Sequence, residues 1–302
     1  MASAHTIAII PQGSKHQYWK AIHAGVNKAA NDLKVRGTGV EIVWKAPWRE
    51  DTREEQVKIV RDFIKSGIQG IVLAPYNSDA LAAPVEEAAR AGISTVVIDS
   101  ALDTCETVSF IASDNEKAGA IAADRMAKLL NNQGAVLLLR YKEGSVSTND
   151  RVKGFMSRLK QIAPNMEIIL AGDFTGNTSY AAMHACMNLL SHHINRVQGI
   201  FTLNEASTAG MLMALQGIQK AGKVTLVGFD SSDIYLDALR YKQLHGLVVQ
   251  DPFRMGELAV KTMADHLAGK PVQKRVDTGV TMVTPENMDM PDAKRVLNPP
   301  LA

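Results

Sequence analysis

Short runs of apolar, often β-branched residues alternate along the chain with longer segments in which apolar residues recur every three or four positions. Runs of the first kind predict strands, and segments of the second kind predict amphipathic helices. The predicted strands are 6–10, 40–44, 70–74, 94–99, 108–111, 135–139, 167–171, 199–203, 224–229 and 246–249. The predicted helices between them include 19–33, 52–66, 80–91, 116–130 and 179–190.

Most of the predicted strands are apolar at every position rather than at alternate positions. This pattern is typical of central strands with both faces covered, and the alternation of strands with helices is typical of a parallel sheet. Ten or so strands are too many for one small sheet. We therefore expect an α/β protein with two doubly wound parallel-sheet domains, and a single (β/α)₈ barrel is the alternative.

An internal repeat favours two domains over the barrel. Segment 69–100 reads strand, helix, Ala-Gly turn, strand and then Asp-Ser, and segment 198–231 has the same order. Two units separated by about 130 residues indicate two domains of similar build, whereas a barrel would spread its similarity over eight units.

The repeat also places one carboxylate in each half, at the end of a predicted strand. Parallel sheets bind ligands beyond the carboxyl ends of their strands. If the halves face each other, Asp99 and Asp230 line opposite walls of one cleft. The alternative is that each aspartate only caps the helix that follows it.

The composition and net charge of the chain exclude several kinds of binding partner and site. The 302 residues suffice for two ordinary domains, and the net charge of +2 is too small to neutralise a row of phosphates, so we expect no nucleic-acid partner. Two cysteines, Cys105 and Cys186, are too few for a disulfide framework or a four-thiolate zinc site. We expect both to be free thiols.

The sequence lacks the motifs of common enzymes and cofactor-binding sites. The first predicted strand is followed by no G-x-G-x-x-G, and the chain contains no G-x-S-x-G. Segment 217–224 resembles a phosphate-binding loop, but it ends in Val and runs from a helix into a strand, the reverse of the required order. We expect no cofactor. The alternative of an enzyme rests on Asp99 and Asp230, which could act as acid and base. The sequence shows no candidate nucleophile beside either residue.

A group of metal-ligating residue types lies in and after one predicted helix: His184, Cys186, His192 and His193. Ligands on a helix usually stand four residues apart, so that they share a face. His184 and Cys186 stand two apart and point to different faces. A polar helix end with a buried thiol is therefore the better interpretation, and we expect no metal.

Polar and aromatic side chains gather where predicted strands end or helices begin. They are Lys15, His16, Tyr18, Trp19, Trp48, Arg49, Asn149, Arg151, Phe174, Asn204 and Gln250. Flat rings stack on the C–H faces of a sugar, and planar amide, carboxylate and guanidinium groups pair with its hydroxyls. The set therefore indicates a polyhydroxylated ligand. For Tyr18 and Trp19, core packing is the alternative.

From residue 6 to about 283, the sequence resembles the ribose-binding branch of the type I periplasmic sugar-binding proteins. The resemblance rests on 109–115 (SFIASDN), the Gly119-bearing helix, 151–155 (RVKGF), the Gly222 turn and 227–230 (VGFD). It implies the type I periplasmic binding protein fold, in which two α/β domains are joined by a three-crossing hinge and close on a sugar. The implied domains are 1–112 plus 251–277 and 113–250 plus 278–302, with crossings near Ser113, Gln250 and Thr278.

The resemblance also implies roles in the cleft. His16 matches an Asn that bonds the sugar, Tyr18 and Trp19 match stacking Phe residues, and Asp99 matches a hydroxyl-binding Asp. Phe174 matches the stacking aromatic of the second domain, where Asn204, Asp230 and Gln250 match polar contacts. Arg151, Ser100 and Asn149 complete the expected site.

Two departures concern the ligand. Ribose binders have Arg at the positions of Ser100 and Asn149. The loss of two guanidinium groups, with the gain of His16 and Trp19, indicates a hydroxyl pattern other than that of ribose. Another pentose, a hexose or a polyol fits, and Lys15 and Arg49 leave an acidic sugar derivative open.

The resemblance further implies a periplasmic or otherwise extracytoplasmic, monomeric protein that delivers its ligand unchanged to the permease subunits of an ABC importer. Residues 1–5 contain no signal peptide, so we expect either a cytoplasmic protein or a chain that begins at a mature terminus. The alternatives are the ligand-sensing core of a LacI-type regulator and a chemoreceptor-linked sugar sensor. Such regulators carry an N-terminal helix-turn-helix, whereas here the first predicted strand begins at Thr6.

Overall fold

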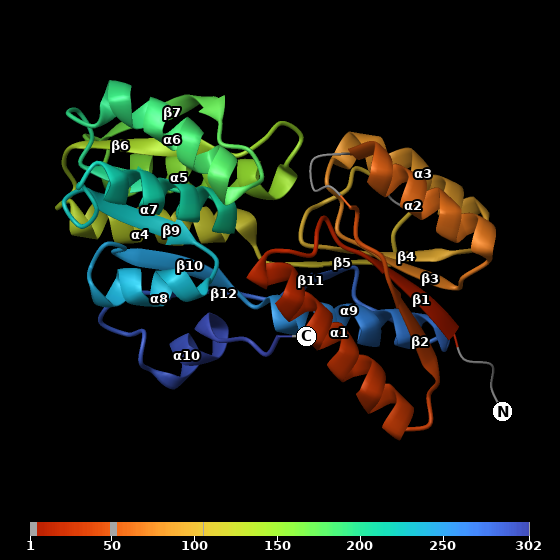
Figure 1. Ribbon diagram of the computed structural model, residues 1–302. Coiled ribbons are helices and arrows are strands. Elements are labelled where there is room, and N and C mark those ends of the chain that lie inside the picture. Colours follow the sequence, from red (N-terminus) through yellow and green to blue (C-terminus); the bar gives the residue numbers. More distant parts are fainter. Residues whose placement is uncertain (1–4, 49–52, 105, 302) are drawn as a thin grey trace.

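Two open sheets organise the chain in the computed structural model, which describes residues 5–48, 53–104 and 106–301. Over those residues each sheet has six strands, and Figure 1 shows the sheets in two lobes side by side. The first sheet has the order β11-β5-β4-β3-β1-β2, and the second has the order β12-β10-β9-β8-β6-β7. Two parallel-sheet domains are confirmed, and the barrel alternative is wrong.

The observed strands lie where the apolar runs predict them. In the first sheet they are β1 (His5–Ile10), β2 (Val40–Trp44), β3 (Gly70–Leu73), β4 (Ser94–Ile98), β5 (Ser109–Ala112) and β11 (Arg275–Asp277). In the second they are β6 (Ala135–Arg140), β7 (Glu167–Phe174), β8 (Gly199–Phe201), β9 (Thr225–Phe229), β10 (Gly246–Gln250) and β12 (Val280–Val283). The short strands β11 and β12 are absent from the prediction, because three or four residues at a sheet edge carry little pattern. β12 runs antiparallel to β10.

Helices cover both faces of each sheet, which explains the continuous apolar strands. Helices α1 (Gln17–Val35) and α9 (Pro252–Leu267) cover one face of the first sheet, and α2 (Arg53–Ser66) and α3 (Ser78–Arg90) cover the other. On the second sheet, α4 (Asn115–Leu129) and α5 (Val146–Ile162) lie opposite α6 (Ser179–His193), α7 (Glu205–Gly217), α8 (Asp233–Arg240) and α10 (Pro291–Leu297). Each lobe therefore has its own core.

Glycines bring one pair of helices into close contact in each lobe. A Cβ atom at Gly25 of α1 would lie 1.9 Å from the Phe253 carbonyl oxygen of α9. In the second lobe, a Cβ atom at Gly119 of α4 would lie 2.0 Å from the Arg151 carbonyl oxygen of α5. These contacts fix the positions of α1 and α5, whose N-terminal turns face the space between the lobes.

The chain passes between the lobes after β5, after β10 and between β11 and β12. Two of these crossings are linked, since the Ser113 and Thr278 hydroxyl oxygens lie 3.3 Å apart. In the crossing between β11 and β12, Gly279 follows Thr278 and turns the chain with a φ of +80°, a conformation that glycine adopts readily.

The structure also bears on the start of α5, on the cysteines and on the lengths of the helices. Asn149 and Arg151 lie within α5 rather than before a helix, because the helix begins at Val146. Cys186 is a free, buried thiol whose pKa burial raises to about 12, whereas Cys105 lies outside the described residues. In the described part of the chain, every helix is too short or too polar to span a lipid bilayer.

Candidate functional site

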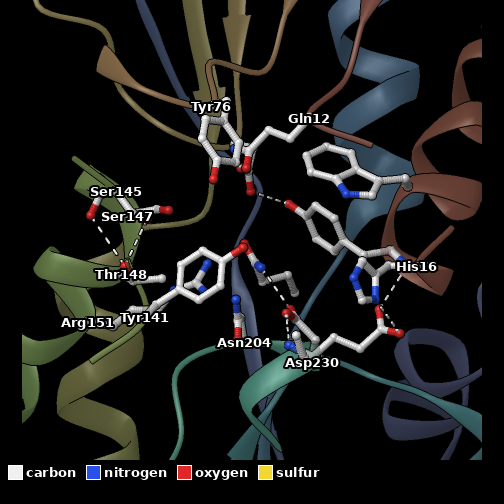
Figure 2. A pocket seen from close by; sticks show the side chains of 16 residues that line it. Gln12, His16, Tyr76, Tyr141, Ser145, Ser147, Thr148, Arg151, Asn204 and Asp230 are labelled. Carbon is white, nitrogen blue, oxygen red and sulfur yellow. Dashed lines mark hydrogen bonds and ion pairs between the residues drawn. The ribbon is translucent and has the colours of Figure 1, made fainter. Parts of the chain in front are cut away.

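A cavity of about 70 Å³ lies between the lobes, at the carboxyl ends of the strands. Figure 2 shows side chains from both lobes pointing into this common space. The lining residues are Gln12, His16, Tyr18, Trp19, Tyr76, Asp99, Tyr141, Ser145, Ser147, Thr148, Arg151, Asn204, Glu205, Ala206, Asp230 and Gln250.

Asp99 and Asp230 occupy equivalent places in the two lobes. Each follows the last residue of a strand, and each has a φ of +66°. This left-handed conformation is uncommon outside glycine, although aspartate tolerates it better than most residues. Ser232, not Asp230, is the N-cap of α8. The two carboxylates therefore end their strands in the same turn and face one cavity, as the internal repeat predicts.

Each carboxylate accepts hydrogen bonds from side chains of its own lobe. The Tyr18 hydroxyl donates to Asp99 Oδ1 at 2.7 Å, and Gln12 Nε2 donates to Asp99 Oδ2 at 3.0 Å. Gln250 Nε2 donates to Asp230 Oδ1 at 2.8 Å, and the backbone N–H of Glu205, in the same lobe, donates to Asp230 Oδ2 at 3.1 Å. These bonds hold both carboxylates in fixed orientations and leave further lone pairs for a ligand.

Burial dominates the electrostatics of the pair. Desolvation raises the pKa of Asp230 to about 6, although Arg151 and the Gln250 bond counteract it. Desolvation also raises the pKa of Asp99, against the influence of Arg151 and Tyr18. The pKa of Tyr18 is raised well above its usual value by burial and by Asp99, so its hydroxyl remains a donor at neutral pH.

Arg151 is the cationic group of the cavity and is itself 3 % exposed. Its Nε donates to Asn115 Oδ1 at 2.9 Å, its Nη1 donates to the Leu203 carbonyl at 2.6 Å, and its guanidinium carbon lies 3.8 Å from the centre of the Phe229 ring. Nη2 has no acceptor among the described residues, so a ligand oxygen can take that donor.

Two amides complete the polar lining from the second lobe. Gln250 Oε1 is buried without a hydrogen-bond partner among the described residues. Asn204 Oδ1 accepts from the Ser207 N–H at 3.0 Å and caps α7, so the amide nitrogen of Asn204 remains for other contacts. An orphaned buried acceptor costs free energy, and a ligand hydroxyl would satisfy it.

The aromatic part of the prediction needs correction. Tyr18 supports Asp99 through its hydroxyl and meets the Trp19 ring edge-on, with ring centres 5.1 Å apart. Phe174 lies outside the cavity, 39 % exposed at the end of β7, where its ring packs under the Arg140 guanidinium. In the second lobe the aromatic residue at the cavity is Tyr141, which directly follows β6.

Two more predicted residues lie outside the lining. Ser100 is buried behind the cavity, and its hydroxyl oxygen accepts from the Ser147 N–H of the other lobe at 3.4 Å. Asn149 lies on the exposed side of α5, because the helix turns it away from Thr148 and Arg151. Trp48 is 86 % exposed at a separate outer recess, and Arg49 lies outside the described residues.

His16 lines the cavity but faces protein acceptors. Its Nδ1 lies 3.3 Å from Glu205 Oε1, and its Nε2 lies 3.3 Å from the carbonyl oxygen of Asn177. Both partners belong to the second lobe. The predicted sugar-bonding role of His16 therefore competes with a contact between the lobes.

Several lining residues went unpredicted: Gln12, Tyr76, Tyr141, Ser145, Ser147, Thr148, Glu205 and Ala206. A usable signal exists for some of them, because Gln12 and Tyr141 follow strands as Asp99 does. The hydroxyl cluster of Ser145, Ser147 and Thr148 begins a helix after β6 and is equally readable. Tyr76 shares this signal, since it lies just beyond the end of β3.

No three His, Cys, Asp or Glu side chains of the described residues gather closely enough to hold a metal ion. His184 packs edge-on against Tyr180, with ring centres 4.5 Å apart, and Cys186 is buried in the core of the second lobe.

Comparisons with known proteins agree with this architecture. The model of the periplasmic binding protein domain family matches residues 7–271. The ribose import binding protein RbsB of Bacillus subtilis is 28 % identical over 282 residues, which cover 92 % of this chain and 87 % of that protein.

Two solved structures are similar over nearly the whole chain. An ABC transporter solute binding protein from Agrobacterium vitis with bound D-fucose is 30 % identical, with a TM-score of 0.89, and the match covers 97 % of this chain and 100 % of that one. A carbohydrate transporter solute binding protein from Agrobacterium radiobacter in complex with D-arabinose is 29 % identical, with a TM-score of 0.90, covering 99 % and 100 %.

Proposed function

This chain belongs to the periplasmic binding protein family, and we propose that it captures a monosaccharide or related polyol between its lobes and delivers it to an ABC importer. The relatives named above are sugar-binding proteins of import systems, which favours this function over a regulator or a chemoreceptor-linked sensor. The observation that carries it is the matched pair Asp99 and Asp230, one from each lobe, across a cavity that also holds Arg151.

The proposed contacts follow from the donors and acceptors that the protein leaves open. Asp99 and Asp230 accept from ligand hydroxyls, and Gln250 Oε1 accepts from another. Arg151 Nη2 and the Asn204 amide donate to ligand oxygens. Carboxylates and guanidinium groups form charge-assisted hydrogen bonds, which are stronger than neutral ones.

Rings complete the proposed site. Trp19 of the first lobe and Tyr141 of the second supply flat faces that suit the C–H surface of a sugar ring. Tyr18 positions Asp99 through its hydroxyl. Ser100 supports the site without touching the ligand. Its hydroxyl oxygen accepts a hydrogen bond from the backbone N–H of Ser147, which lines the cavity.

We propose that the ligand is uncharged. Asp99, Asp230 and Glu205 place three carboxyl groups around the cavity, against two cations: the guanidinium of Arg151 in the lining and the Lys142 ammonium, whose charge reaches Asp99 from beyond it. A carboxylate or phosphate on the ligand would meet this negative surplus at low dielectric constant, which is unfavourable. The acidic sugar derivatives that Lys15 leaves open therefore fit less well, since Lys15 borders the outer recess instead.

The remaining parts of the proposal concern the whole protein. The ligand is released unchanged, the protein acts outside the cytoplasm as a monomer, and the permease subunits of the importer are its partners. The lobes move about crossings near Ser113, Gln250 and Thr278, with 1–112 plus 251–277 in one domain and 113–250 plus 278–302 in the other. Support comes from the family and from the three passages of the chain between the sheets.

A thermal-shift screen tests the function. A ligand that binds only the folded protein raises the unfolding temperature, and at one hundred times its Kd it adds about 2.7 kcal/mol of stability. D-Ribose, D-arabinose, D-fucose, pentitols and the matching sugar acids form the panel. We expect a neutral member to raise the unfolding temperature and to be recovered unchanged after incubation.

Asp230→Asn should abolish most of that shift, whereas Asp62→Asn, at an exposed position on α2, should keep it. A panel in which no neutral sugar or polyol stabilises the protein contradicts the proposal. Recovery of a chemically altered sugar contradicts binding without conversion.

A further inference from the structure

The N-terminus of α1 meets a carboxylate of the opposite lobe. Glu205 Oε2 accepts from the Tyr18 N–H at 3.4 Å, and Glu205 Oε1 lies 3.3 Å from Nδ1 of His16, the N-cap residue of α1. The His16 side chain makes no capping bond to its own helix, and the first turn of α1 holds no acidic residue. Helix N-termini carry unsatisfied N–H groups and favour negative charge. Glu205 thus supplies, across the cavity, the anionic cap that α1 lacks.

Both ring nitrogens of His16 face acceptors of the second lobe. One faces the Glu205 carboxylate, and the other faces the Asn177 carbonyl oxygen, each at 3.3 Å. A neutral imidazole has one N–H and can donate to only one of them, whereas the imidazolium donates to both. Proton binding by His16 therefore strengthens the contact between the lobes.

We propose that His16 and Glu205 form a proton-sensitive clamp that holds the two lobes closed over the ligand. His16 is then a positioning residue rather than a ligand contact. This inference rests on the proposed function, because the clamp assists capture by closure. Since it joins protein to protein, it stabilises every closed complex by the same amount, whichever sugar is enclosed.

Other charges surround the clamp. Within the described residues, the groups on the cavity side are Asp99, Arg151 and Asp230, and those on the outer side are Lys15, Lys45 and Glu55. The Glu205 carboxylate lies 3.3 Å from the imidazole, and at that distance its negative charge strongly favours a proton on the ring. The side chains of His16 and Glu205 are 20 % and 14 % exposed, so salt screens the pair only in part.

The main test is a double-mutant cycle of His16→Ala and Glu205→Gln, with affinities measured by calorimetry for each neutral sugar that binds. At pH 6 we expect each single variant to lose about tenfold in affinity, by the same factor for every sugar. The double variant should lose little more than either single variant, because both remove one interaction. Glu87→Gln, which breaks a surface ion pair with Arg61 within the first lobe, is the control and should lose nothing.

The pH dependence of the affinity shows whether the proton on His16 strengthens the contact between His16 and Glu205. From pH 6 to pH 8 the affinity of the parent should fall relative to that of His16→Ala, since only the parent loses the imidazolium. Asp230 also titrates near pH 6, but it is present in both proteins and cancels in the comparison. His16→Gln replaces His16→Ala if the latter does not fold.

Small-angle scattering of the ligand-free proteins tests, without a sugar, whether the contact between His16 and Glu205 holds the lobes together. At pH 6 we expect Glu205→Gln to have a larger radius of gyration than the parent. If no sugar binds the parent, the proposed function fails, and scattering still decides the clamp. Additive losses in the cycle, an altered preference among sugars, or equal radii would each overturn it.

Discussion

At the scale of single residues, the cavity is a set of polar groups held ready by the protein itself. Gln12 and Tyr18 orient Asp99, and Gln250 orients Asp230. The cost of ordering these groups is met on folding rather than on binding, which favours affinity. Each carboxylate can therefore be tested on its own.

Removing either carboxylate should weaken sugar binding strongly. For Asp230→Ala we expect a loss of about 30- to 150-fold, or ~2–3 kcal/mol, because a charge-assisted bond is lost and the Gln250 amide loses its acceptor. Asp99→Ala should behave alike. Calorimetry with the sugar found in the screen measures both. Losses of less than about twofold in both variants would show that the carboxylates do not contact the ligand.

The aromatic residues offer a matched contrast. Trp19→Ala should lose about tenfold or more in affinity, because Trp19 lines the cavity, whereas Phe174→Ala should bind as the parent does. Phe174 packs against Arg140 on the surface instead. Equal losses in the two variants would restore Phe174 to the site.

Asp230 should also make the ligand-free protein less stable at neutral pH. Burial raises its pKa to about 6, above the value in the unfolded chain, so the folded state binds the proton more tightly and the stability contribution falls as pH rises from about 4 to about 6. Asp230→Asn removes this dependence. Its amide can donate to Gln250 Oε1, which lacks a partner among the described residues, once that side chain flips.

We therefore expect Asp230→Asn to gain stability over the parent across that pH range, with a constant difference above about pH 6. Denaturant unfolding without sugar, at several pH values, measures the difference. A difference independent of pH between 4 and 6 would contradict the raised pKa.

At the scale of elements, close helix contacts place the binding residues. The first two turns of α5 carry Ser147, Thr148 and Arg151, and their position depends on the approach of α4 at Gly119. The pair α1 and α9 repeats this arrangement in the first lobe through Gly25. Small residues in the middle of these helices are thus requirements of the site as well as of the core.

Gly119→Ala and Gly217→Ala form a matched test of this dependence. A Cβ atom at position 119 would overlap the Arg151 carbonyl oxygen, so α5 must move, and we expect a loss of about 1–3 kcal/mol in stability together with weaker sugar binding. Gly217, at the end of α7, has open space around its Cα, and Gly217→Ala should be neutral or stabilising by about 0.5–1 kcal/mol. Denaturant unfolding and calorimetry measure both, and equal effects would contradict the packing argument.

At the scale of the whole molecule, the structure is a closed form. Contacts reach across the cavity at His16 and Glu205 on one side and at Ser100 and Ser147 on the other. The Lys142 ammonium also lies 3.0 Å from the centre of the Tyr76 ring in the opposite lobe. These contacts join the two lobes at several points around the cavity.

Sugar should therefore make the protein more compact. We expect scattering from the sugar-saturated protein to match this structure, and the ligand-free protein to have a larger radius of gyration, because the lobes separate about their crossings. A sugar that the protein does not bind is the control. Identical curves with and without the bound sugar would contradict closure.

The sequence by itself determined the order of strands and helices apart from the short strands β11 and β12, the two-lobed α/β architecture and the equivalence of Asp99 with Asp230. These properties depend on local patterns, since an apolar run or a repeated Asp-Ser is read within one segment. Residues at or just beyond the end of a strand, such as Gln250 and Asn204, share that advantage, because parallel strands end at one edge of a sheet.

Tertiary structure alone decided which neighbours each residue meets. Phe174 and Tyr141 both lie at the end of a strand, yet only the packing of the second lobe shows that Tyr141 reaches the cavity. The contact of His16 with Glu205 joins residues far apart in the chain and exists only when the lobes are closed. Such contacts depend on the relative placement of two independently folded cores, and no periodicity within a segment records that placement.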